Sequence, residues 1–153
     1  METNLKVKEF NEIIKQDPIF LGDGTQRESY TKTMLNSYLN ILNMDNLITA
    51  FTSIHRSAIG SREEFKTILD ELKVLIATGS SDYNYEGDIW VLYEKNGKLY
   101  EVSTFHDSIS GFDWDPEEVY MEELLNRFTT GTFFNKFGEE VKSKIQEFLF
   151  IIT

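Results

Sequence analysis

The sequence feature that most constrains the fold is an Asn-Gly pair between two apolar segments, Ile89–Glu94 and Leu99–Thr104. Asn96-Gly97 is typical of a two-residue type I′ turn, because both central residues of that turn take positive φ angles. We therefore predict a β-hairpin whose register is fixed by its turn. Three pairs should share the inward face: Tyr93 with Tyr100, Val91 with Val102, and Ile89 with Thr104. Two pairs should share the other face: Leu92 with Glu101, and Glu94 with Leu99.

An isolated hairpin is marginally stable in water, so its inner face needs helices or a further strand, for which Tyr83–Tyr85 is a candidate. Apolar spacing predicts helices over most of the remaining chain. They are expected at Leu5–Gln16, Tyr30–Leu42, Leu47–Ala58, Ser61–Gly79 with Ser61 as N-cap, Asp115–Phe128 and Val141–Ile151, with a loop at Ile19–Gln26. The expected fold is α+β, a single domain over 1–153, mainly helical, with a small antiparallel sheet (hairpin 89–104) packed against helices.

Composition restricts the class of protein. The chain of 153 residues is 41% hydrophobic and 14% aromatic, which is far from the composition of disordered chains. It has no cysteine, so disulfides, thiolate zinc sites and cysteine nucleophiles are excluded. Because no apolar stretch is long enough for a bilayer and no secretory signal is evident, we expect a cytoplasmic protein.

The net charge of -11 is concentrated in one part of the sequence. Between Asp82 and Glu123 there are 12 acidic residues against Lys95 and Lys98, a local balance of -10, which leaves about -1 for the rest. Such a surface repels nucleic-acid phosphates and anionic membranes and favours basic protein partners. We therefore expect a basic or nucleic-acid-binding protein partner and neither direct nucleic-acid binding nor membrane binding.

The same region interleaves aromatic residues with carboxylates, a combination that suits a binding surface because Tyr and Trp are enriched in interaction hot spots. The candidate partner-binding residues are Tyr83, Tyr85, Glu86, Asp88, Asp107, Asp113, Trp114, Asp115 and Glu117. Their carboxylates could stand in for phosphates in a groove that normally holds nucleic acid. The alternative is that the aromatics are ordinary core residues and the carboxylates a solvated rim.

A second interpretation is a metal site formed by His106, Asp113 and Asp115, because a histidine and carboxylates in one loop can bind a divalent cation. A helix start explains Asp115-Pro116-Glu117-Glu118 without any ligand. Asp115 would be the N-cap, Pro116 the first helical residue and Glu118 the third. A calcium loop beginning at Asp113 would also need glycine where Glu118 stands and glutamate where Leu124 stands.

Motifs for catalysis are missing from the sequence. Gly22-Asp23-Gly24 lacks the rest of a phosphate-binding loop, His55 lacks a partner at zinc-binding spacing, and no serine lies in a Gly-x-Ser-x-Gly motif. We therefore expect no cofactor and no enzymatic activity.

Four short segments lie within Tyr83–Leu125: Tyr83-x-Tyr85-Glu86-Gly87-Asp88, Leu99-Tyr100-Glu101-Val102, His106 and Trp114-x-Pro116-Glu117-Glu118. Together they resemble a family of small uncharacterised bacterial and phage proteins. In that family the hairpin is often followed by His-Cys-Ser-Cys-Tyr-Gly, whereas this chain has His106-Asp107-Ser108-Ile109-Ser110-Gly111 and lacks both cysteines. The resemblance implies a phage or mobile-element setting and no particular activity.

Charge, aromatics and resemblance together favour a phage-associated acidic interaction protein that inhibits a host defence or nucleic-acid-handling complex. A CRISPR effector is one such target, reached by nucleic-acid mimicry in the manner of an anti-CRISPR. Two alternatives stay open. One is a metal-binding module or metal-dependent enzyme centred on the 106–118 loop, and the other is an adaptor or immunity protein of a bacterial conflict locus.

Overall fold

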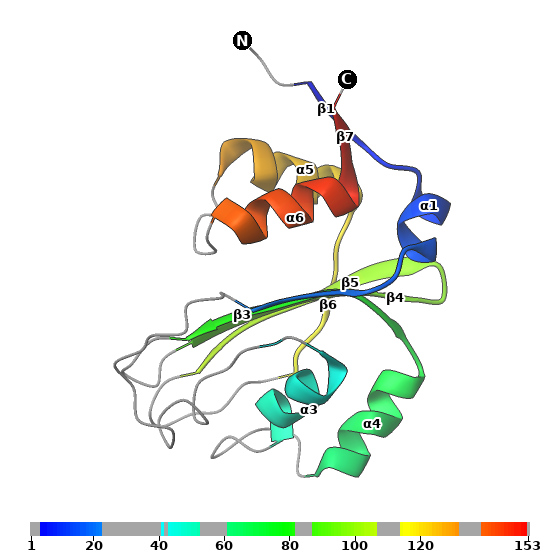
Figure 1. Cartoon of the computed structure of the whole chain (residues 1–153). Coiled ribbons are helices and arrows are strands. Elements are labelled where there is room, and N and C mark those ends of the chain that lie inside the picture. Colours follow the sequence, from blue (N-terminus) through cyan, green and yellow to red (C-terminus); the bar gives the residue numbers. More distant parts are fainter. Residues whose placement is uncertain are drawn as a thin grey trace.

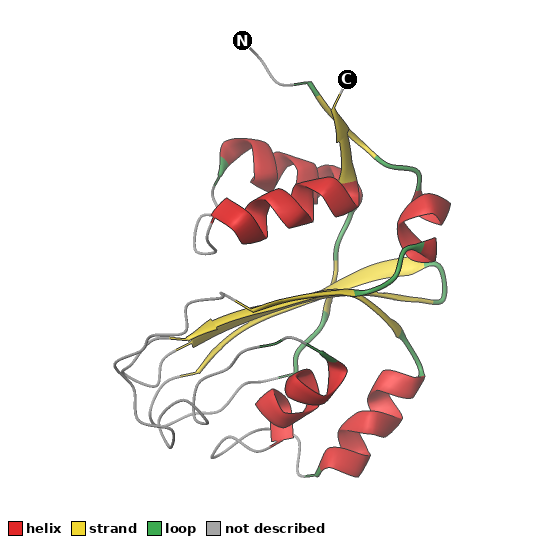
Figure 2. Ribbon diagram, in the orientation of Figure 1, coloured by secondary structure: helices red, strands yellow, loops and turns green. Residues whose placement is uncertain are grey.

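The computed structural model shows a five-stranded sheet with helices on both faces (Figures 1 and 2). It describes residues 4–22, 41, 43–52, 61–81, 87–106, 114–131 and 139–152. The strands of this sheet are β2 (Ile19–Gly22), β3 (Lys73–Ser81), β4 (Gly87–Lys95), β5 (Lys98–His106) and β6 (Glu117–Glu118), in the spatial order β2-β3-β4-β5-β6. The β2–β3 pair is parallel and the other pairs are antiparallel, so the sheet is mixed.

The predicted hairpin is confirmed as β4 and β5. Its register has the expected pairs, among them Tyr93 with Tyr100 and Leu92 with Glu101. The turn residues Asn96 and Gly97 have φ angles of 54° and 80°, as a type I′ turn requires. The Gly97 amide also donates a hydrogen bond to Glu94 Oε1 at 2.9 Å. Local turn chemistry therefore fixes the centre of the sheet.

One face of the sheet is covered by a group of elements that we call the upper layer, and the other face by a pair that we call the lower layer (Figure 1). The upper layer contains α1 (Phe10–Lys15), α5 (Met121–Thr130), α6 (Glu139–Leu149) and an antiparallel ribbon of β1 (Leu5–Val7) with β7 (Phe150–Ile152). The lower layer contains α3 (Met44–Thr52) and α4 (Arg62–Asp70). The ribbon brings the two ends of the described chain side by side.

Two apolar cores result, one on each face of the sheet. The upper core includes Trp90 and Leu92, and the lower core includes Val91 and Tyr93. Successive residues of β4 therefore enter opposite cores, as the alternation of a strand requires. The inward face expected for the hairpin does point into a core, but its other face is buried too, since Leu92 and Leu99 lie in the upper core.

The sheet is larger than the sequence predicts, and the described chain is a mixed α and β structure, not a mainly helical one. The helix expected at Ser61–Gly79 begins as predicted, with Ser61 Oγ accepting a hydrogen bond from the Glu64 amide at 3.1 Å, but ends at Asp70. Residues from Lys73 form β3 instead, and Gly79 lies inside this strand. Four residues of the loop expected at Ile19–Gln26 form β2.

Other expected boundaries also change, because pairing with a neighbouring strand overrides the local preference of a segment for helix. The first three residues of the helix expected at Leu5–Gln16 form β1, and α1 then ends at Lys15 with Gln16 as its C-cap. The last predicted helix gives way at Phe150 to β7. The third predicted helix, Leu47–Ala58, is described only up to residue 52, and these residues belong to α3, which begins earlier, at Met44. The second predicted helix, apart from residue 41, and the Tyr83–Tyr85 strand lie outside the described residues.

The largest correction affects the helix expected to start at Asp115. Glu117 and Glu118 form β6, which pairs with Glu101 and Tyr100 of β5. The following Val119 amide donates to the Leu99 carbonyl at 3.0 Å, so this segment stays extended until α5 begins at Met121. Capping by Asp115 and the following residues is therefore wrong.

None of the helices in the described segments has the length and apolar character to cross a membrane.

The Thr78 hydroxyl is fully buried in β3 and makes no hydrogen bond within the described structure. Replacing Thr78 by valine, which keeps the shape, should raise the free energy of unfolding by about 1 kcal/mol because it removes an unsatisfied polar group. Thr78→Ser keeps the hydroxyl and loses a methyl group, so it should lower stability by a similar amount. Urea denaturation measures both, and a valine variant less stable than the wild type would mean that the hydroxyl has a partner.

Candidate functional site

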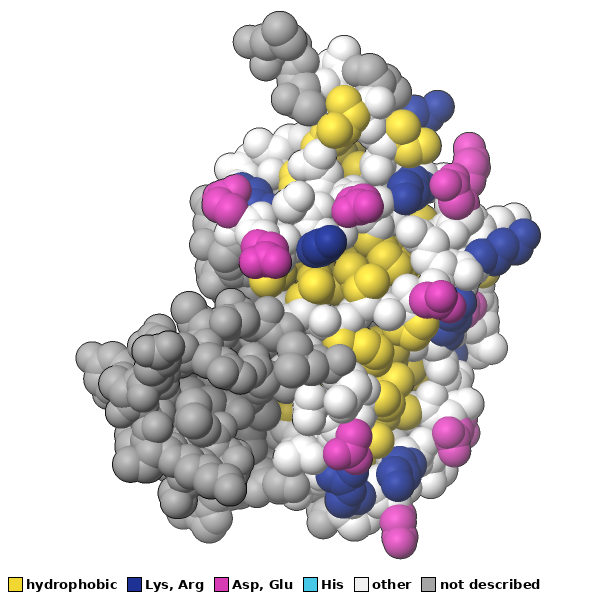
Figure 3. Space-filling view, viewed as in Figure 1, with side chains coloured by type: hydrophobic (Ala, Val, Ile, Leu, Met, Phe, Trp, Pro, Cys, Tyr) yellow, Lys and Arg dark blue, Asp and Glu magenta, His cyan; other side chains and the backbone are white. Residues whose placement is uncertain are grey.

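Exposed carboxylates are concentrated where the chain passes from β6 into α5. All five acidic residues between positions 115 and 123 are exposed, and this stretch contains no lysine or arginine. They are Asp115, Glu117, Glu118, Glu122 and Glu123. On the face seen in Figure 3, by contrast, acidic and basic side chains are interspersed around an apolar band. The stretch from Asp115 to Glu123 is therefore a one-sign segment of the surface.

Strand β6 divides its two carboxylates between the two faces of the sheet. Glu117 pairs with Glu101, whose neighbours are in the upper layer, and Glu118 pairs with Tyr100, which packs against the lower core. Directly opposite residues of an antiparallel pair share a face. Glu117 and Glu118 therefore present their charge on opposite sides of the β6 edge.

Trp114 is packed into the lower core, where it is only partly exposed. Its indole meets the Phe51 and Phe65 rings edge-on, with centroid distances of 5.3 Å and 5.0 Å. It also stacks on Tyr93 at 5.7 Å with an interplanar angle of 13°. Burial raises the pKa of the Tyr93 phenol above its ordinary value, and the neighbouring Tyr100 adds to this shift. Most of the Trp114 ring is thus packed in the lower core, and this packing fixes the position of the chain just before β6.

Asp88 lies apart from the other described candidates. It pairs with Phe105 near the start of β4, whereas Glu117 lies in the row of Leu92 and Glu101. Four residues of extended strand separate these two rows, about 13 Å along the strand. Asp88 and Glu117 therefore do not form one compact site.

The other predicted partner-binding residues lie outside the described residues. They are Tyr83, Tyr85, Glu86, Asp107 and Asp113. The strand ends that border them are described: Ser81 pairs with Gly87, and Gly87 pairs with His106. Both intervening segments thus leave the sheet from the same end.

The metal-site interpretation draws no support from the described part of the chain. That part contains no group of three or more His, Cys, Asp or Glu residues placed to hold a metal ion. His106 is the last residue of β5, and its side chain, like all of Asp113, is outside what the structure describes. Of the three proposed ligands, only Asp115 has its side chain described, and this side chain is exposed.

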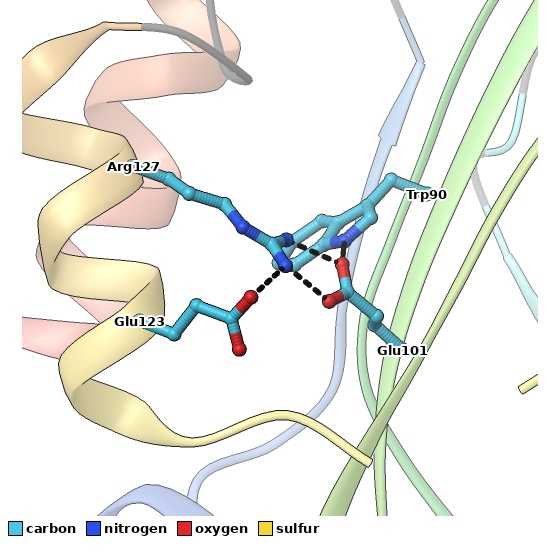
Figure 4. Close-up of polar contacts among 4 residues, drawn as sticks. All are labelled: Trp90, Glu101, Glu123 and Arg127. Atoms are coloured by element: carbon cyan, nitrogen blue, oxygen red, sulfur yellow. Dashed lines mark hydrogen bonds and ion pairs between the residues drawn. The ribbon is translucent and has the colours of Figure 1, made fainter. Parts of the chain in front are cut away.

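A buried ion pair, missed by the sequence analysis, connects the sheet to α5 (Figure 4). The Arg127 guanidinium donates to both carboxylate oxygens of Glu101, at 2.7 Å and 2.8 Å, and to Glu123 at 2.7 Å. The Trp90 indole donates to Glu101 at 2.9 Å. The hydrogen bonds to Glu101 are the main cause that raises the pKa of Arg127 above its ordinary value, against the opposing effect of burial. This arrangement closes the upper core and pairs both oxygens of the buried Glu101 carboxylate, so its role is structural.

Two further exposed residues, also missed as candidates, lie beside this edge of the sheet. Glu118 is exposed opposite Tyr100, and Tyr120 is 64% exposed. The sequence pattern assigns Glu118 to a helix start and does not single out Tyr120. The sequence signal that could have found them is the alternation of residues 117–120, in which Val119 is apolar between two side chains that face away from the upper core.

No protein-family model matches the sequence, and comparison with curated proteins and with solved structures gave no significant match.

Proposed function

We propose that this chain is a phage-associated, non-enzymatic interaction protein that inhibits a host defence or nucleic-acid-handling complex. It would act as an anti-CRISPR does, by occupying a basic surface of the target with carboxylates that stand in for phosphates. The observation behind the proposal is the one-sign segment from Asp115 to Glu123, all of whose five acidic side chains are exposed.

The electrostatics of this segment support a basic partner. Only Glu123 is neutralised by a described ion pair, with Arg127, so the carboxylates of Asp115, Glu117 and Glu118 are in no described ion pair. Unpaired surface charges of one sign attract an oppositely charged protein over a distance of about 10 Å at moderate salt. Such charges increase the association rate and its salt dependence more than they tighten the final complex.

The proposal is tested by capture of proteins from a bacterial lysate that contains candidate defence nucleases. A triple variant, Asp115→Asn, Glu117→Gln and Glu118→Gln, removes three charges from the one-sign segment. We expect it to slow association with a captured basic protein by about tenfold at low salt, because like-signed steering charges act together. Surface plasmon resonance measures the association rate.

A matched control removes three exposed charges elsewhere, by Glu9→Gln, Glu12→Gln and Glu140→Gln in or beside the upper layer. It reduces the net negative charge by the same three units but leaves the one-sign segment intact, so it should slow association much less than the first variant does. Equal effects of both variants would mean that total charge matters and the one-sign segment does not. If no basic protein is captured even at low salt, the proposed function is wrong.

A further inference from the structure

We infer that Tyr100, Glu118 and Tyr120, which we call the β6 strip, bind an arginine side chain of the partner protein. This inference rests on the proposed function and gives it a contact surface and a preferred residue.

The strip begins at Tyr100, at one end of a stack of aromatic rings. Tyr100 stacks on Tyr93 at 5.3 Å with an interplanar angle of 19°, so one face of the Tyr100 ring is covered. The next position in the same row across the sheet is Glu118 of β6. Directly opposite side chains in such a row have Cβ atoms about 5 Å apart. The second face of Tyr100 thus looks toward a carboxylate at the edge of the sheet, and Tyr100 is partly exposed there.

Tyr120 extends the strip along the chain. Its backbone is extended, with φ of -105° and ψ of 147°, and the intervening Val119 is buried in the upper core. In an extended chain alternate side chains share a side, so Glu118 and Tyr120 lie on the same side, opposite to Val119. At 64% exposure, Tyr120 is one of three large apolar side chains exposed in the described chain. A carboxylate is thus flanked by two accessible tyrosines.

This combination suits arginine better than lysine. A guanidinium is planar, so it can stack on an aromatic face while its N–H groups donate to a carboxylate in a bidentate arrangement. A lysine ammonium is a compact charge that makes neither contact in the same geometry. Since Glu118 is in no described ion pair, its carboxylate oxygens are available to such a donor.

The test compares dye-labelled hexa-arginine and hexa-lysine peptides, which have equal charge, by fluorescence anisotropy at about 50 mM salt, where surface attraction is only partly screened. We expect the wild type to bind the arginine peptide about tenfold more tightly, the effect of a stacked and hydrogen-bonded guanidinium. The double variant Glu118→Gln and Tyr120→Ser should lose this preference.

A matched control, Glu140→Gln and Ile152→Ser, removes one exposed charge and one apolar side chain that is also 64% exposed. The control should keep the arginine preference, and circular dichroism should confirm that both variants fold. Equal binding of the two peptides by the wild type, or a preference that survives in the strip variant, would overturn this inference but leave the acidic-surface proposal standing. If the wild type binds neither peptide, both this inference and the acidic-surface proposal are contradicted.

Discussion

Replacing Arg127 by methionine should lower the free energy of unfolding by about 3 kcal/mol at neutral pH, because it leaves the buried Glu101 carboxylate without its cation. Glu101 is 6% exposed, so water cannot replace the two lost hydrogen bonds. Of the donors in the described residues, only the Trp90 indole would still donate to this carboxylate. Urea denaturation of the wild type and the variant at neutral pH measures the difference.

A second variant shows whether the lost stability comes from the unpaired Glu101 charge or from lost packing of the Arg127 side chain. In the double variant Glu101→Gln and Arg127→Met the side chain at 101 is neutral and can still accept the Trp90 hydrogen bond. It should recover most of the stability lost in the single variant, since neutral groups can replace a buried ion pair at little net cost. If the double variant is as unstable as Arg127→Met, the methionine fits badly and the charge of Glu101 is not the cause.

This ion pair shows what a single sequence can and cannot predict. The register that places Glu101 opposite Leu92 followed from Asn96-Gly97 alone, because turn chemistry is local. Its partner Arg127 lies 26 residues later on α5, and no local pattern connects the two. A glutamate among apolar neighbours predicts a buried partner in general, but the choice of Arg127 depends on how α5 docks on the sheet.

The strands that the sequence did not predict have no distinctive period of hydrophobic residues. Val74 to Ala77 form a continuous apolar run, and such a run fits a buried helix as well as a strand buried on both faces. The preceding α4 pattern continued naturally into it through Leu72 and Leu75. Strands β1, β2 and β6 have two to four residues each, too few to show alternation, and they form because a neighbouring strand is available.

The candidate site was predicted in part. The concentration of charge near residues 115–123 was visible in composition, and Asp115 and Glu117 are indeed exposed. The predicted helix start at Asp115-Pro116-Glu117-Glu118 would place Glu118 in the first turn of a helix and away from the edge of the sheet. The pairing of Glu118 with Tyr100 needs the fifth strand, which only the folded chain reveals.

Replacing Phe65 by alanine should produce the largest loss of stability, about 3 to 5 kcal/mol, the usual cost of removing a buried aromatic ring. Phe65 is fully buried in α4 and contacts both Phe51, at a centroid distance of 5.2 Å, and Trp114. The cavity would lie where the lower layer meets the chain that leads into β6. Thermal and urea unfolding, followed by near-ultraviolet circular dichroism, measure the stability and the packing of Trp114.

The same experiment decides between the two interpretations of Trp114, as a core residue or as part of a partner surface. Phe65→Leu, which retains most of the apolar volume, should cost less than half as much as the alanine variant, because the cavity is smaller. If the core assignment holds, both variants should also weaken the near-ultraviolet signal in proportion to their loss of packing. A loss below about 1 kcal/mol for Phe65→Ala would mean that Trp114 is held only weakly by the lower core. The indole would then be available to a partner, and the binding surface would extend from the β6 strip to Trp114.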